Sequence, residues 1–149
     1  PPRSTLFPYT TLFRSAEIGG KEYSMTCVSV GNPHCVIFVD NVDKVDIEKT
    51  GPQIENAEIF PERINTEFVR VVNRRTLKMR VWERGNGETL ACGTGACAAA
   101  VAAVLEGKCD KGKDITVKLR GGDLIVNYTD EKITLTGDCN LVFTGEIEY

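Results

Sequence analysis

The sequence predicts an α+β domain in which a mostly antiparallel, curved sheet wraps around one buried central helix. Short runs rich in β-branched and aromatic residues, separated by turn residues, occupy most of the chain. One helix-length segment, residues 96–105, is apolar on every side, as in a helix with no solvent-facing stripe. The runs after it are joined by short turns, as in an antiparallel meander. The chain of 149 residues is long enough for one domain with its own core.

The elements before that helix begin with two predicted strands, residues 23–30 and 34–40, which flank the turn signal Gly31-Asn32-Pro33. Residues 46–56 are polar. Within them we expect a short helix near residues 52–56, with its proline at an early helical position, where the missing N–H costs least.

A hairpin, the central helix and a meander complete the predicted fold. Residues 67–72 and 77–82 predict the hairpin, and Gly107 is the expected end of the helix that follows. The remaining predicted strands are residues 115–120, 123–128, 132–136 and 141–147.

The first 15 residues differ from the rest of the chain. They contain Thr-Leu-Phe twice and have neither a helical nor a strand period. We expect residues 1–15 to be a translated sequencing adapter joined to a truncated gene, disordered and outside the fold. A natural N-terminal arm is the alternative. The domain then covers residues 16–149.

The composition argues against several function classes. The formal net charge is −3, with both signs interspersed, so neither a nucleic-acid footprint nor a polybasic membrane patch is visible. No apolar run approaches the length of a membrane span. The start does not resemble a signal peptide, and we expect a cytoplasmic protein.

The cysteines are expected to be reduced, because the chain is too long and too apolar to need disulfide bonds. No Cys-x-x-Cys pair occurs and there is one histidine, which argues against a metal site. Five of the six are expected to be structural, mostly as small core residues. The six are Cys27, Cys35, Cys92, Cys97, Cys109 and Cys139.

Cys92 is the exception, because it lies where a glycine-rich turn becomes the alanine-rich helix. A thiol there is near the positive end of the helix dipole, which favours a lowered pKa. The N–H groups that follow it form an anion site. The sequence therefore predicts a thiolate base beside a carboxylate site, an arrangement suited to proton transfer at a carbon next to a carboxylate.

Three motifs, taken together, resemble the C-terminal half of the diaminopimelate epimerase family. They are Gly-Asn-Pro-His at residues 31–34, Arg-Ile-Asn-Thr-Glu-Phe-Val at 63–69, and Glu-Arg-Gly-Asn-Gly-Glu-Thr-Leu-Ala-Cys-Gly-Thr-Gly-Ala-Cys at 83–97. The resemblance implies a two-domain fold with the active site in the cleft between the domains. It also implies a cofactor-independent reaction, in which two cysteines on opposite faces of the substrate invert its α-carbon.

The resemblance assigns roles to particular residues. Cys92 would be one of the two catalytic cysteines, with His34 and Glu83 tuning the cysteine pKa values. The substrate-binding residues would be Asn32, Asn65, Glu83 and Arg84 at the distal end of diaminopimelate, and the N–H groups of Gly93 and Thr94 at the α-carboxylate.

The chain departs from the family pattern in one respect. It contains no Gly-Asn-Gly-x-Arg-Cys segment, which would carry the second cysteine. We therefore expect a truncated epimerase, inactive alone, whose partners are the missing N-terminal domain and an amino-acid substrate, with a homodimer as an open alternative. Residues 141–149 would form a strand that pairs with that domain.

Two other functions stay open. The first is a proline or hydroxyproline racemase of the same fold, although its relatives favour a different sequence before Cys-Gly-Thr-Gly. The second is a non-catalytic binding or dimerisation module. The partial dinucleotide fingerprint at Gly93-x-Gly95 is rejected, because hairpins follow the helix where a nucleotide site needs parallel β-α-β units.

Overall fold

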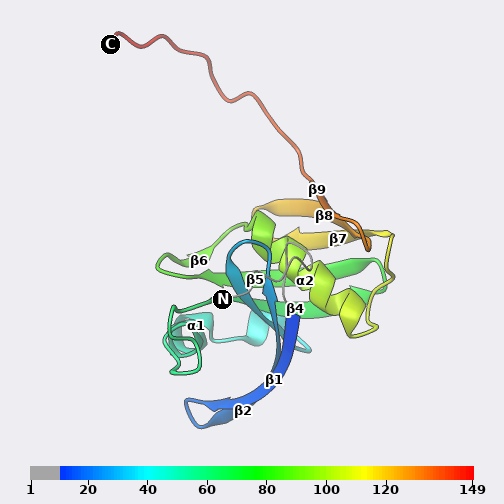
Figure 1. The fold of residues 1–149 in the computed structure, drawn as a ribbon. Helices are drawn as coiled ribbons and strands as arrows, with labels where there is room; N and C mark the ends of the chain where they lie inside the picture. Colours follow the sequence, from blue (N-terminus) through cyan, green and yellow to red (C-terminus); the bar gives the residue numbers. More distant parts are fainter. Residues whose placement is uncertain (1–10) are drawn as a thin grey trace, which may run out of the picture.

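The computed structural model describes residues 11–149. Within that range the chain forms one nine-stranded sheet with two α-helices and a short 3-10 helix (Figure 1). The strands are β1 (Thr11–Ile18), β2 (Lys21–Ser29), β3 (Pro33–Phe38), β4 (Asn65–Asn73), β5 (Thr76–Glu83), β6 (Gly87–Thr89), β7 (Asp114–Leu119), β8 (Gly122–Tyr128) and β9 (Ile133–Thr136). The helices are η1 (Val42–Lys44), α1 (Ile47–Glu55) and α2 (Gly93–Leu105).

The sheet runs in the order β1-β2-β3-β4-β5-β7-β8-β9, with β6 paired to β5 off this path. The pairs are antiparallel except for β3–β4 and β5–β7. Each parallel pair is joined by a crossover that contains a helix, α1 for the first and α2 for the second, as parallel strands require. The predicted α+β class is confirmed.

Helix α2 is the centre of the larger core. Its alanines, with Gly95 and Val101, are buried, and it contacts strands from β2 to β9. Figure 1 shows α2 lying along the sheet. Small side chains on every side let the curved sheet approach the helix closely, which explains a helix with no polar stripe. Its two ends open to solvent, at Thr94 and Leu105.

A second core forms on the opposite face of the sheet, under α1. Residues alternate between the two cores along each strand, as the period of two requires. Val36 and Val69 belong to the α2 core, whereas their neighbours Ile37 and Phe68 belong to the α1 core. The side chains of β3 and β4 on the α2 face therefore point toward the start of α2.

Helix α1 begins earlier than predicted, at Ile47, and Pro52 lies inside it. The expectation of a helix confined to residues 52–56 was wrong. The buried residues Ile47 and Ile54 are seven apart and stabilise the extra turn by packing against Phe68. That tertiary contact offsets the backbone hydrogen bond that Pro52 cannot donate.

The expectation that residues 1–15 are disordered is wrong for residues 11–15. They belong to β1, which pairs with β2 from Thr11↔Val28 to Ile18↔Lys21. Ile18 is buried in the α1 core. Residues 1–10 of that predicted segment lie outside the described residues.

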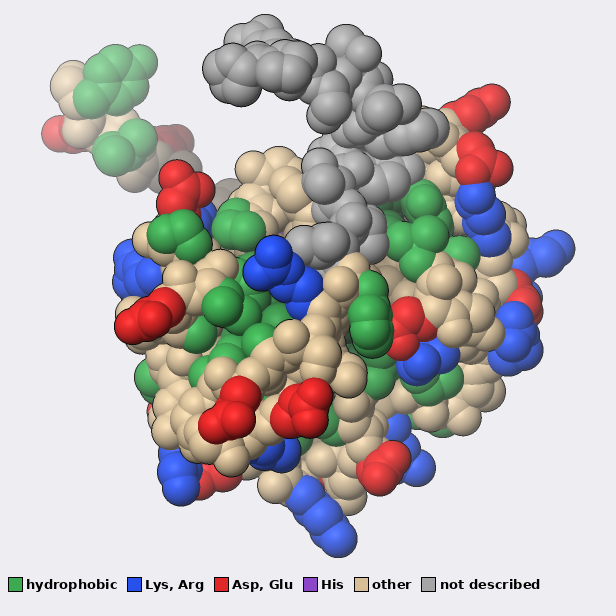
Figure 2. All heavy atoms as spheres, turned by 60° about the horizontal axis from the view of Figure 1, so that its bottom comes forward, with side chains coloured by type: hydrophobic (Ala, Val, Ile, Leu, Met, Phe, Trp, Pro, Cys, Tyr) green, Lys and Arg blue, Asp and Glu red, His purple; other side chains and the backbone are tan. Residues whose placement is uncertain are grey.

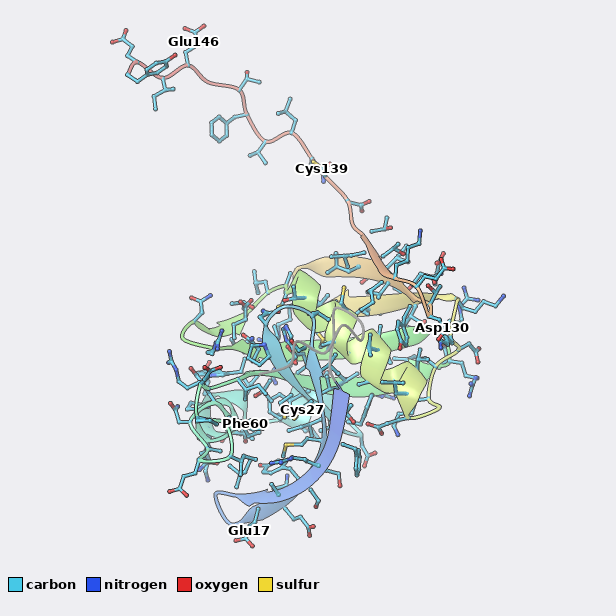
Figure 3. All side chains as sticks on the ribbon, viewed as in Figure 1. Glu17, Cys27, Phe60, Asp130, Cys139 and Glu146 are labelled. Atoms are coloured by element: carbon cyan, nitrogen blue, oxygen red, sulfur yellow. The ribbon has the colours of Figure 1, made fainter. Side chains whose placement is uncertain are left out.

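The predicted strand at residues 141–147 is not formed. Residues 137–149 have no assigned secondary structure and extend away from the domain, as Figures 1 and 3 show, with Cys139 and Glu146 labelled in Figure 3. Leu141, Val142 and Phe143 are 79–87% exposed. The physical reason is that no strand among residues 11–136 lies beside them. Their pairing with a second domain stays a prediction.

The surface carries charges of both signs. Figure 2 shows acidic and basic side chains interspersed over the face that it presents. Among residues 11–149 no helix has the length and apolar character needed to cross a membrane.

Candidate functional site

Cys92 is the residue that caps the N-terminus of α2. Its extended backbone lets its Sγ accept a hydrogen bond from the N–H of Gly95 at 3.3 Å. Thr94 Oγ1 lies 3.7 Å from the same sulfur. The N–H groups of Gly93 and Thr94 are in the first turn, where a helix offers them no acceptor. A half-buried thiol therefore lies beside the first-turn N–H groups, and the use of these groups as an anion site stays a prediction.

The expected direction of the Cys92 pKa was wrong. Burial raises the pKa of the Cys92 thiol above its ordinary value, and nearby Glu67 and Glu83 raise it further. Hydrogen bonds from Gly95 and Thr94 lower this pKa but do not outweigh burial. The position of Cys92 at the start of a helix does not by itself reveal the two carboxylates near the sulfur.

Asn32, in the turn before β3, and His34, the second residue of β3, connect to the start of α2. His34 Nε2 lies 2.9 Å from Asn32 Oδ1, and Asn32 Nδ2 donates to Thr94 Oγ1 at 3.4 Å. With the contact between Thr94 and Cys92, this makes a continuous chain of polar contacts from His34 to the sulfur. The fold thus brings together four residues that are up to 62 positions apart in the sequence, since Asn32 and His34 lie at the start of β3 and Cys92 and Thr94 at the start of α2.

Asn65 connects the two loops that carry the other predicted residues. Its Nδ2 donates to the carbonyl of Pro33 at 2.8 Å, and its Oδ1 accepts from the N–H of Arg84 at 2.9 Å. Because both the oxygen and the nitrogen of its amide bind main-chain groups, Asn65 links the two loops by hydrogen bonds. Arg84 Nη1 donates to the carbonyl of Glu62 at 3.0 Å.

Glu83 ends β5 and faces the short strand β6. Thr89 Oγ1 donates a short hydrogen bond to Glu83 Oε1. The turn between them needs glycine, because Gly85 and Gly87 have φ values of +75° and +87°. Glu83 is half-buried and close enough to raise the pKa of Cys92, so it belongs to the same site.

Two buried carboxylates were missed by the sequence analysis. Glu67 lies 2.7 Å from His34 Nδ1, and both side chains are fully buried. Glu55 binds Trp82 Nε1 at 2.8 Å and the N–H of Gly85 at 2.8 Å, which supports the loop that carries Arg84. The signal for Glu67 was its position two residues after Asn65 in a strand, which puts both side chains on one face.

Thr94 at this site is exposed and Cys92 is half-buried. A hollow of about 700 Å³ lies elsewhere, between β2, η1 and α1, and none of the predicted site residues line it. Within residues 11–149, no three His, Cys, Asp or Glu side chains are grouped to hold a metal ion. All six cysteines are free thiols.

Comparison with known proteins identifies the family. The family model for diaminopimelate epimerase matches residues 26–142. The chain belongs to the diaminopimelate epimerase family. The predicted resemblance is therefore confirmed, and every site residue predicted from it lies inside the matched range.

Curated relatives agree with this membership. The chain is 55% identical to the diaminopimelate epimerase of Acetivibrio thermocellus over 141 residues, covering 92% of this chain and 50% of the relative. It is 53% identical to the diaminopimelate epimerase of Nostoc punctiforme over 133 residues, which cover 88% of this chain and 47% of that relative. The chain thus spans about half the length of the curated relatives it matches.

Solved structures agree on the fold. A predicted epimerase from Pseudomonas aeruginosa is 19% identical, with a TM-score of 0.54, over 82% of this chain and 46% of that chain. A phenazine biosynthesis protein of the PhzF family from Enterococcus faecalis is 17% identical, with a TM-score of 0.51, over 69% of this chain and 36% of that protein. For this member of the diaminopimelate epimerase family, these structures support the architecture alone.

Proposed function

We propose that this chain supplies one of the two proton-transfer half-sites of a diaminopimelate epimerase. The reaction would interconvert LL- and meso-diaminopimelate without a cofactor, in lysine and cell-wall precursor synthesis. The observation that carries the proposal is the position of Cys92 at the start of α2, beside the unpaired first-turn N–H groups of Gly93 and Thr94. The proposed setting is the cytoplasm, where six free thiols would stay reduced.

The substrate would dock by its α-carboxylate. The N–H groups of Gly93 and Thr94 would donate to its oxygens, with the helix dipole favouring the negative charge. When the α-proton leaves, the electron pair of the C–H bond moves into the carboxylate, whose negative charge increases. The same donors therefore bind the transition state more strongly than the ground state, which lowers the barrier.

Cys92 would begin as the proton donor. Burial and two carboxylates raise its pKa, which favours the protonated thiol. A thiolate on the opposite face would take the α-proton, and Cys92 would deliver its own proton to the other face of the same carbon. That leaves Cys92 as a thiolate and the opposite group as a thiol, and the reverse reaction exchanges their roles.

The distal end of diaminopimelate would lie toward the loop at Arg84. The guanidinium of Arg84 suits a carboxylate and the carboxylate of Glu83 suits an ammonium group. Asn32 would contribute its side-chain amide. Asn65 would act mainly by holding the Pro33 and Arg84 loops together, because its amide already binds both.

The second thiol would come from the part of the relatives that this chain does not match. The exposed apolar residues at 141–149 would pair with that part, which would bury them and close the open site. Closure would exclude water from Cys92 and strengthen every electrostatic contact around it. Alone, the chain is expected to lack epimerase activity.

The test is exchange of the substrate α-proton in deuterated water. We would compare the chain alone, the chain with the unmatched half of the Acetivibrio thermocellus relative, and both with Cys92→Ala or Cys97→Ala in this chain. Exchange with inversion is expected only in the mixtures, to be lost with Cys92→Ala and kept with Cys97→Ala.

Two outcomes would overturn the proposal. One is exchange of diaminopimelate by the chain alone, and the other is an active mixture that tolerates Cys92→Ala. Running proline and hydroxyproline in parallel checks the substrate class. Exchange of these substrates without diaminopimelate would assign the chain to the racemase alternative.

A further inference from the structure

Glu67 is a buried carboxylate whose hydrogen bonding is directed at one side chain. Its Oε1 lies 2.7 Å from His34 Nδ1, and its Oε2 is buried without a hydrogen-bond partner among the described residues. Glu55 differs, because its two oxygens together bind Trp82, Gly85 and an arginine. Burying a carboxyl group for one contact is costly, and burial raises the pKa of Glu67 while His34 opposes that rise. The contact with His34 is therefore the feature to explain.

The surroundings of His34 determine which ring nitrogens carry hydrogen. Asn32 Nδ2 donates to Thr94 Oγ1, so Asn32 turns its Oδ1 to His34 Nε2. That oxygen can only accept, and Nε2 must therefore carry an N–H. On the other side of the ring, Nδ1 faces a carboxyl group at 2.7 Å, and one proton lies between them.

We propose that Glu67 is a positioning residue for His34: it shares a proton with Nδ1 and thereby holds the ring with its Nε2–H turned to Asn32 and the start of α2. This role rests on the proposed function, since it gives His34 a defined proton to hold beside the reacting groups. Glu67 touches no substrate. Its contact with His34 Nδ1 at 2.7 Å, where both side chains are fully buried, is the route by which it would position the ring.

The direction of the polar chain supports this role. The Nε2–H of His34 donates to Asn32, and Asn32 donates to Thr94, which leaves the Thr94 hydroxyl hydrogen free to point at Cys92 Sγ. Each hydrogen-bond donor in this series is oriented by the group before it, and the series begins at Glu67. Without the shared proton, the hydrogens that the His34 ring offers to its neighbours change, whereas the structure of strand β4 does not.

The first test uses the single histidine of the chain, whose ring signals need no assignment. Direct proton NMR spectra and two-bond proton–nitrogen spectra would be recorded for the wild type, Glu67→Gln and Thr66→Val. An amide cannot share a proton with Nδ1, so Glu67→Gln is expected to lose the strongly downfield shared-proton signal. Thr66→Val is the matched control, because Thr66 Oγ1 is the neighbouring buried atom without a partner. Its ring signals should match the wild type.

The second test is the steady-state kinetics of the mixture with the unmatched half of the relative. For Glu67→Gln we expect kcat to fall about 10–100-fold with KM changed less than about threefold, as for other residues that orient a catalytic side chain. Thr66→Val should leave both unchanged. A purely structural role would instead change both variants alike through stability.

The outcomes separate this inference from the proposed function. Unchanged His34 signals in Glu67→Gln, or an unchanged kcat with altered signals, overturn the positioning role. If the wild-type mixture is inactive, the proposed function fails, and the NMR comparison on this chain alone still decides whether Glu67 sets the state of the His34 ring.

Discussion

Replacing Gly95 with alanine would test how closely the start of α2 packs against the buried His34–Glu67 pair. A β-carbon added to Gly95 would lie 2.7 Å from Glu67 Oε1 and 3.1 Å from Cys92 Sγ. The carboxylate oxygen cannot move away freely, because it is fully buried and lies 2.7 Å from His34 Nδ1. The substitution must therefore displace either the helix start or the hydrogen bond.

The magnitude follows from opposing effects. Alanine is favoured over glycine inside a helix by roughly 1 kcal/mol. Overpacking a buried site costs about 1–3 kcal/mol, and loss of a hydrogen bond to a charged group costs about 1.5–3 kcal/mol. Because the steric cost falls on a pinned side chain, we expect the free energy of unfolding to fall by about 2 kcal/mol, against the helix-propensity trend.

Urea unfolding measures this change. With a slope of about 1–3 kcal/mol per molar urea, the midpoint of Gly95→Ala should fall by roughly 1 M. Gly93→Ala is the matched control on the same helix. Its new β-carbon would meet only Leu135 Cδ2 at 3.0 Å, and that side chain is 46% exposed and can move. A Gly95→Ala midpoint equal to or above the wild type would refute the close packing.

Three further predictions use other features of the chain. Alkylation of Cys92 with iodoacetamide, followed by peptide mass spectrometry, should show an inflection above the ordinary cysteine pKa of about 8.5, and an inflection below that pH would contradict the raised pKa. Arg80→Met should lower the free energy of unfolding by about 2 kcal/mol, because the mostly buried Glu88 loses its two-pronged partner and keeps Arg120 at 2.9 Å. Because Arg80 lowers the pKa of Glu88, this contribution is present above the unfolded carboxyl pKa of about 4.3 and is lost as the pH falls through the folded value. Unfolding of both proteins at pH 7 and pH 3 should therefore show a smaller difference at pH 3, and an equal difference would contradict the ion pair. Deletion of the residues after Asn140 should change the free energy of unfolding by less than about 0.5 kcal/mol, yet abolish exchange in the mixture, and a large loss of stability would contradict the exposed state of this segment.

Much of the fold could be predicted from the sequence, because the strands carry a period of two and α2 is apolar on all sides. The predictions were wrong where distant contacts outweigh the local pattern. Strand β1 has no clear period, but β2 supplies its hydrogen bonds and Ile18 anchors its end in the core. Helix α1 depends on Ile47 and Ile54 packing under the sheet, which the polar composition of the segment concealed.

The sequence predicted which residues form the site better than it predicted their electrostatic environment. Cys92, His34 and Asn32 are brought together as expected. The pKa of Cys92 was predicted in the wrong direction, because a helix start was considered without the burial of the sulfur and without the carboxylates near it. The sequence motif that contains Glu67 indicated no role for it, since its partner His34 lies 33 residues away. Only the parallel pairing of β3 with β4 brings the two side chains into contact.

The bridge that Asn65 makes between the Pro33 and Arg84 loops bears on ligand affinity. A ligand that meets flexible loops loses binding free energy by immobilising them, about 0.5–1.5 kcal/mol for each long side chain. Here the loops are already joined by two hydrogen bonds to main chain before any ligand arrives. This ordering entropy is lost during folding, and weakening the bridge would loosen ligand binding even if every group that touches the ligand were kept.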